Sequence, residues 1–78
     1  MKQNIAPLHD LPLGQWARVE SISAEGALRR RLIDLGLVKG SKVCCLHKSP
    51  AGDPVAYKIR GSVISLRRED SCRVLISF

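Results

Sequence analysis

Glycine and proline recur along this chain at intervals too short for long helices or long strands. Both residues interrupt regular structure, because proline lacks a backbone donor and glycine favours turn conformations. The chain is thereby divided into short elements, and short, strongly bent strands suit a small closed or nearly closed β-barrel that hides its strand edges. The interrupting residues are Pro7, Pro12, Gly14, Gly26, Gly36, Gly40, Pro50, Gly52, Pro54 and Gly61.

The length of 78 residues allows one domain, over residues 1–78, with a thin hydrophobic core. A domain of this size buries only ~60% of the surface that its unfolded chain exposes. A deep catalytic cleft would compete with that core for the same few apolar side chains. We therefore predict a protein that is not an enzyme, uses no cofactor and acts through its outer surface.

Composition indicates a cytoplasmic protein. No apolar run approaches the ~20 residues of a membrane-spanning helix, and the opening MKQNIAPLHD lacks the apolar middle of a signal peptide. The three cysteines are an odd number, and the adjacent pair Cys44 and Cys45 would make a strained bridge. We expect reduced thiols, with Cys72 and at least one of the adjacent pair filling the core.

One amphipathic helix is predicted between the first two strands. Leu28, Leu32 and Leu35 follow the helical spacing of one apolar face, and Ser23 is expected to cap the start. Gly36 is placed to take the left-handed conformation that ends a helix, and Leu37 then folds back on the last turn.

About five strands are predicted from alternating apolar and polar residues. In the first, Ile22 breaks the alternation, which a β-bulge would explain. A helical turn is expected at Arg67 to Ser71, and the opening PLHDLPLG should dock Leu8, Leu11 and Leu13 on the core. On the last strand, Cys72, Val74, Ile76 and Phe78 should share a face. The strands are Trp16 to Ile22, Lys42 to Lys48, Val55 to Ile59, Val63 to Leu66 and Cys72 to Phe78.

Three motifs in order resemble the FeoA family of bacterial ferrous iron uptake. They are LxxLPLGxxARV, RRRLIDLGLVKGSKV and SPAGDPVAYKIRGSVISLRRED, and the match as a whole runs from about Leu8 to Ile76. The pattern is also similar to the SH3-like domain at the C-terminus of some iron- and manganese-dependent repressors. Lys39 departs from it, because the family usually has proline there.

The resemblance implies a mainly β, SH3-like barrel with one internal helix. It also implies a small accessory or regulatory protein that binds the cytosolic part of FeoB, a membrane transporter with a GTP-binding domain, and is recruited to the inner face of the membrane. The chain lacks the P-loop pattern GxxxxGK[ST], so nucleotide chemistry would belong to the partner. The family's structural motif falls on Arg31, Leu32, Leu35, Gly36, Gly40, Pro50, Gly52, Asp53, Pro54, Gly61 and Arg67.

The predicted helix and the turn that follows it are the candidate partner surface. A helix packed across a barrel leaves a groove beside it, which Leu28, Ile33, Leu37 and Val38 could line. Ile33 lies off the apolar face of the helix, so it is the best candidate for an exposed apolar contact. Arg31 is expected instead to cap backbone carbonyls or to pair with Asp34 or Asp70. The proposed contact residues are Arg29, Arg30, Ile33, Leu37, Val38 and Lys39.

Two other functions remain open for this chain. The net charge of +6 would suit nucleic acid or a repressor-type role. Single-strand binders add several exposed aromatic rings, however, and only Trp16 is expected to be exposed, so no nucleic acid partner is predicted. A small Fe(II) carrier would need convergent ligands, and the best local pair is Cys45 and His47, which would share a strand face. We predict no metal site.

Overall fold

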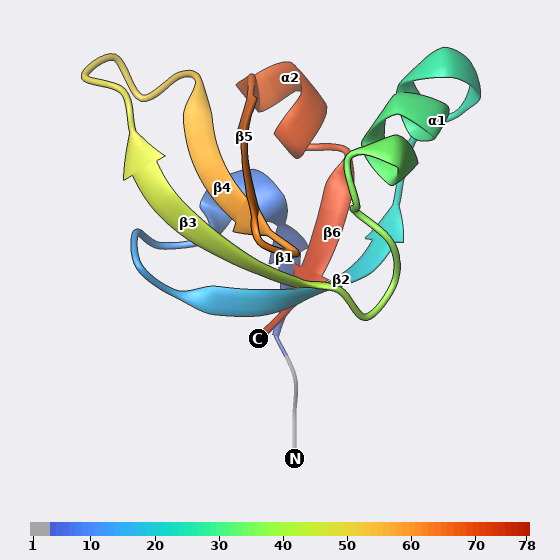
Figure 1. Ribbon diagram of the computed structural model, residues 1–78, viewed down its shortest axis with the longest axis horizontal. Coiled ribbons are helices and arrows are strands. Elements are labelled where there is room, and N and C mark those ends of the chain that lie inside the picture. The colour runs from blue at the N-terminus through green and yellow to red at the C-terminus, as the bar shows by residue number, and fades with distance from the viewer. Residues whose placement is uncertain (1–3) are drawn as a thin grey trace.

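The computed structural model describes residues 4–78, and residues 1–3 of the expected domain lie outside the described residues. Six antiparallel strands form one sheet in the order β1-β6-β2-β3-β4-β5. Figure 1 shows this sheet strongly bent, with both α-helices at one end of the molecule. The elements are β1 (Ile5–Pro7), the 3-10 helix η1 (Leu8–Asp10), β2 (Trp16–Ile22), α1 (Gly26–Asp34), β3 (Lys42–Lys48), β4 (Val55–Ile59), β5 (Ser62–Leu66), α2 (Arg68–Ser71) and β6 (Val74–Ser77).

The mainly β, SH3-like architecture with one internal helix is confirmed, with one strand more than expected. The additional strand is β1, which pairs with β6 through the register Ile5 to Ser77. Three residues ending in proline show no alternation, so sequence patterning misses such a strand. Within residues 4–78, β1 and β5 stand at the two ends of the strand order and do not pair with each other.

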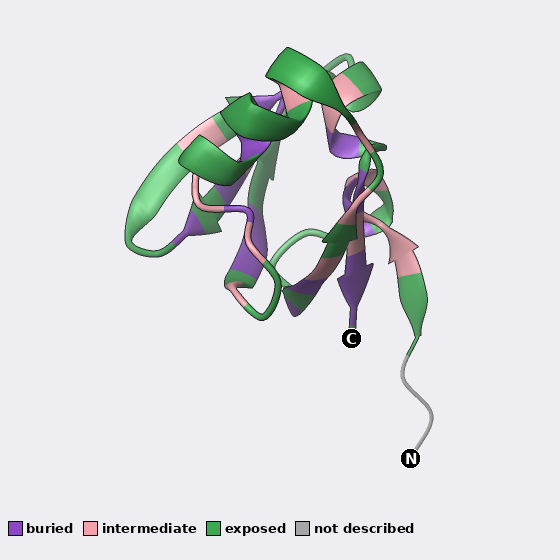
Figure 2. Ribbon diagram, turned by 90° about the vertical axis from the view of Figure 1, so that its right-hand side faces the viewer, coloured by how far each residue is buried: buried purple, intermediate pink, exposed green. Residues whose placement is uncertain are grey.

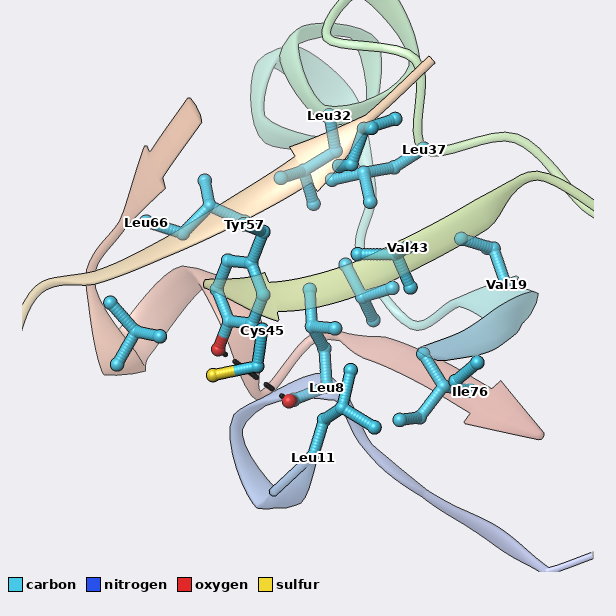
Figure 3. Close-up of a cluster of buried hydrophobic side chains, with 14 residues drawn as sticks. Leu8, Leu11, Val19, Leu32, Leu37, Val43, Cys45, Tyr57, Leu66 and Ile76 are labelled. Carbon is cyan, nitrogen blue, oxygen red and sulfur yellow. Dashed lines mark hydrogen bonds between the residues drawn. The ribbon is translucent and has the colours of Figure 1, made fainter. Parts of the chain in front are cut away.

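The core gathers buried side chains from the sheet, from α1 and from the opening segment (Figure 3). Leu8 and Leu11 are fully buried as expected, and the Tyr57 hydroxyl donates to the Leu8 carbonyl oxygen at 3.5 Å. Leu13 was expected beside them, but its side chain is 60% exposed. The backbone N–H of Gly14 donates to the Cys45 carbonyl at 2.7 Å, so the chain returns to β3 just beyond Leu13.

The end of α1 follows the sequence prediction closely. Gly36 has φ 103°, its N–H donates to Ile33, and the N–H of Leu37 donates to Leu32 at 3.1 Å. These paired bonds form a Schellman motif, which satisfies carbonyls that the helix itself leaves free. The predicted cap at the start is wrong, because Glu25 occupies the capping position without a side-chain bond and the Ser23 N–H donates to Arg73.

Each long strand contains an irregularity that changes which side chains face the core. In β2 the pairing register shifts between Val19 and Ser21, so Ile22 joins the inner face, as the broken alternation predicted. In β3 the register shifts between Cys45 and His47. The extra residue in each bulge moves the side chains that follow it to the opposite face of the sheet.

Polar contacts tie α2 to the rest of the domain, and two of them involve residues of the family motif. The Arg68 N–H, at the start of α2, donates to the Asp53 carboxylate at 2.8 Å. Arg31 on α1 lies 3.6 Å from Asp70, which is one of the two partners expected for it. The family motif residues Asp53 and Arg31 thus have structural contacts that link separate elements.

The last strand is shorter than predicted, and only two of the four residues expected to share its face, Val74 and Ile76, do so. β6 covers Val74–Ser77, with Val74 and Ile76 buried. In Figure 2 the strand that ends beside the C-terminus is drawn largely in the purple of buried residues. Cys72 is exposed at the end of α2, before the strand begins, and Phe78 is exposed beyond its end. The helical turn at α2 displaces Cys72 from the strand, so this cysteine does not fill the core.

Candidate functional site

A groove of about 440 Å³ lies between α1, the β2 strand and the turn before β3. Five of the six residues predicted to contact a partner line this one groove. Arg30 is the exception, and it lines an adjoining hollow of about 360 Å³ together with Arg29 and Ile33. The groove residues are Ser21, Ile22, Arg29, Ile33, Leu37, Val38 and Lys39.

The apolar side chains of the groove differ in how far they are exposed to solvent. Leu37 is fully buried, so it belongs to the core and offers no free surface of its own, contrary to its predicted role as a direct contact. Val38 is half-buried, and Ile33 on α1 is 38% exposed. Ile33 is therefore the apolar side chain that a partner could cover.

The Schellman motif is what places these residues beside one another. Ile33 occupies the last turn of α1, and the reversal at Gly36 directs the chain back to the barrel. Val38 and Lys39 then form a turn in which the Ser41 N–H donates to Val38 at 3.0 Å. Lys39 occupies its site without the proline usual in the family, and Gly40 supplies the positive φ of 89° that the turn requires.

Positive charge surrounds the groove. Arg29 reaches across it, and its guanidinium donates to the Ile22 carbonyl at 3.2 Å. Arg30 and Lys39 are exposed, and the pair Arg31–Asp70 is the sole ion pair found within residues 4–78. The free cations beside an apolar side chain suit a partner surface that is acidic and partly apolar.

Sequence reasoning missed the contribution of β2 to this groove and misplaced Leu28. Ser21 and Ile22 reach the groove because of the β2 bulge, and the broken alternation at Ile22 was the available signal. Leu28 lies on another side of α1, in a more polar hollow of about 770 Å³ with Glu25 and Arg73.

The Cys45 and His47 pair does not form a metal site. Cys45 lies in the core with Val43, and the β3 bulge that follows it leaves His47 exposed, so the expectation that Cys45 and His47 share a face is wrong. Burial raises the pKa of the Cys45 thiol, which keeps it protonated. Across residues 4–78, no group of three His, Cys, Asp or Glu side chains is arranged to hold a metal ion.

Comparison with known proteins identifies a matching family and a relative that is a fusion protein. The family model of the FeoA domain matches residues 6–77. A relative from Porphyromonas gingivalis (strain ATCC BAA-308 / W83), the Fe(2+) transport protein A/Fe(2+) transporter FeoB fusion protein, is 33% identical over 67 residues. The match covers 86% of this chain and spans 8% of the length of that fusion protein.

Solved structures agree with the family model. The solution structure of the FeoA protein from Chlorobium tepidum superposes with a TM-score of 0.83 at 40% identity, covering 90% of this chain and 67% of that one. A manganese-dependent transcriptional repressor superposes with a TM-score of 0.84 at 16% identity, covering 97% of this chain and 42% of the repressor. At that identity the second likeness concerns the fold alone.

Proposed function

Because this chain belongs to the FeoA family of ferrous iron transport, we propose that it is an accessory protein that binds the cytosolic region of a FeoB transporter. The observation that carries the proposal is the Porphyromonas gingivalis relative, in which a FeoA region and a FeoB transporter are parts of one chain. Covalent linkage holds two modules at high effective concentration, which favours modules that function in contact.

In this proposal the contact is made through the groove of about 440 Å³ between α1, β2 and the turn before β3, which is called the α1 groove from here on. Ile33 supplies an apolar anchor, while Arg30 and Lys39 supply free positive charge at its edge. Such a surface would attract an acidic partner and bury an apolar side chain on docking. The chain contributes no reaction of its own, and its effect on ferrous iron import is exerted through this contact.

The proposed location is the cytoplasm, with recruitment to the inner face of the membrane through the partner. Neither helix in residues 4–78 has the length and apolar character that a membrane crossing requires. The three cysteines are free thiols, as is usual in a reducing compartment.

Calorimetric titration of the purified chain into the purified cytosolic region of FeoB tests this function. We expect saturable binding that weakens as salt is raised, because surface charges contribute to the encounter. A parallel titration with a non-hydrolysable GTP analogue measures whether the nucleotide state of the partner changes the affinity. Absence of binding in both nucleotide states would contradict the proposal.

A further inference from the structure

A second cleft, of about 510 Å³, lies on the outer face of the sheet and shares no lining residue with the α1 groove. It crosses β6, β2 and β3 at the end of the molecule near the chain's last residue. Its volume is within the ~300–1,000 Å³ range of ligand-binding pockets. The lining residues are Trp16, Ala17, Arg18, Lys42, Ser77 and Phe78.

Two aromatic side chains give this cleft apolar walls that water covers in the free protein. Trp16 is 53% exposed and Phe78 is 42% exposed, while Ala17, which also lines the cleft, is buried. Aromatic rings bury large areas at low entropic cost, which makes them frequent anchors of protein contacts. The cleft is therefore suited to one large apolar side chain of a partner.

Two cations stand side by side at the same cleft. Arg18 and Lys42 are direct cross-strand partners between β2 and β3. Like charges in that position repel each other. Within the described chain the sole ion pair joins Arg31 to Asp70, so neither cation has a carboxylate partner. The guanidinium of Arg18 donates to the Gly40 carbonyl at 2.9 Å, which holds it against the turn before β3 and leaves its charge without a carboxylate among residues 4–78.

We propose that this cleft binds a short acidic segment of a partner protein. One large apolar side chain of that segment enters between Trp16 and Phe78, and neighbouring carboxylates lie against Arg18 and Lys42. An anion between these two cations relieves their mutual repulsion, so charge complementarity selects an acidic occupant.

The position of the cleft in the sheet also restricts how the segment is recognised. β2 is paired on both sides, with β6 and with β3, so it offers no free edge for an added strand. Recognition must come from side chains. A single apolar hollow with two cations fits a short peptide better than a nucleic acid, which needs a continuous line of cations along its phosphates.

The single tryptophan of the chain reports directly on the cleft, because Trp16 is that tryptophan. The probe is a tryptophan-free peptide with one leucine between glutamates. Two control peptides replace the leucine by alanine or the glutamates by glutamines. We expect a saturable change of Trp16 emission with the first peptide, weakened about tenfold or more by either replacement.

Matched variants locate the binding through the anisotropy of the same peptide carrying a fluorophore. Lys42→Glu should weaken binding about tenfold, whereas Lys48→Glu, at the other end of β3 and outside the cleft, should leave it within about twofold. Trp16→Ala should also weaken binding, and Val63→Ala, an exposed apolar residue outside the cleft, should not.

Equal binding of all three peptides, or equal losses in Lys42→Glu and Lys48→Glu, would overturn the proposal. So would a Trp16 response to single-stranded oligonucleotide, to phosphatidylserine vesicles or to rising concentration of the chain itself when the peptides give none. The experiment contains no transporter, so its failure would leave the proposed contact at the α1 groove untouched.

Discussion

Gly36 packs directly against Ile59, so the end of α1 and the strand β4 meet without a side chain between them. A Cβ atom on Gly36 would lie 3.2 Å from Ile59 Cγ2 and 3.3 Å from Arg60 Cδ. The position also has φ 103°, a conformation that glycine adopts without strain. Two independent constraints therefore require glycine at the point where the helix turns back to the barrel.

Gly36→Ala should lower the free energy of unfolding by about 1 kcal/mol or more. Gly40→Ala is the matched control, because Gly40 has φ 89° but no atom within 4 Å of an added Cβ. Gly40→Ala should therefore show only the cost of backbone strain, with a smaller loss in the free energy of unfolding. Urea unfolding of both variants measures the difference, and a loss at Gly36 no greater than that at Gly40 would contradict the packing argument.

Stability should fall in alkaline solution as Tyr57 loses its proton. Burial raises the pKa of the Tyr57 phenol to about 12, against about 10 in the unfolded chain. The folded state holds this proton more tightly, so its stabilising contribution is complete below about pH 10 and is lost towards about pH 12.

Urea unfolding across that pH interval measures the loss, with Tyr57→Phe as the control. The variant should show a smaller decline than the parent, because its ring carries no proton to lose. Tyr57 is the only tyrosine, so phenolate absorbance follows it directly. Ionisation near the ordinary tyrosine value while the chain is still folded would show that the ring is not shielded as described.

One thiol should react much faster than the other two in the native protein. Cys72 is exposed, whereas Cys44 and Cys45 are buried and burial raises the pKa of Cys45. Reaction with a chromogenic disulfide reagent requires an accessible thiolate. We expect one fast thiol in the native chain, its loss in Cys72→Ser, and reaction of all three in denaturant; a second fast thiol would place Cys44 or Cys45 at the surface.

Arg30→Glu should leave the fold intact and weaken binding to the cytosolic region of FeoB. Arg30 is exposed on α1, and reversing a peripheral charge mainly slows association. Lys48→Glu carries the same change of charge outside the groove and serves as the control. Surface plasmon resonance at low salt compares the association rates, and equal rates would remove Arg30 from the contact.

Local signals in the sequence predicted most of the fold. The end of α1 follows from Gly36 and the spacing of its leucines, because a Schellman motif is specified by neighbouring residues. The strands β2, β3 and β4 have their predicted bounds. In each of these elements the sequence signal, a helix-ending glycine or an alternation of apolar and polar residues, lies within a few positions, so a single sequence contains it.

The errors fall where distant contacts determine the outcome. Nothing near Leu13 indicates that the backbone of Gly14 bonds to β3. Because it does, the Leu13 side chain stays exposed to solvent. The β3 bulge that separates Cys45 from His47 depends on the pairing with β4. For the α1 groove, the helix residues followed from periodicity, whereas Ser21 came from a neighbouring strand that only the folded chain brings close.

Docking of the domain through the groove beside α1 can be observed residue by residue in its amide chemical shifts. The isotopically labelled chain would be titrated with the unlabelled cytosolic region of FeoB. We expect the largest shifts at Arg29, Ile33, Val38 and Lys39, which line this groove. Shifts confined to α2 and β5, or no shifts at saturating partner, would contradict it.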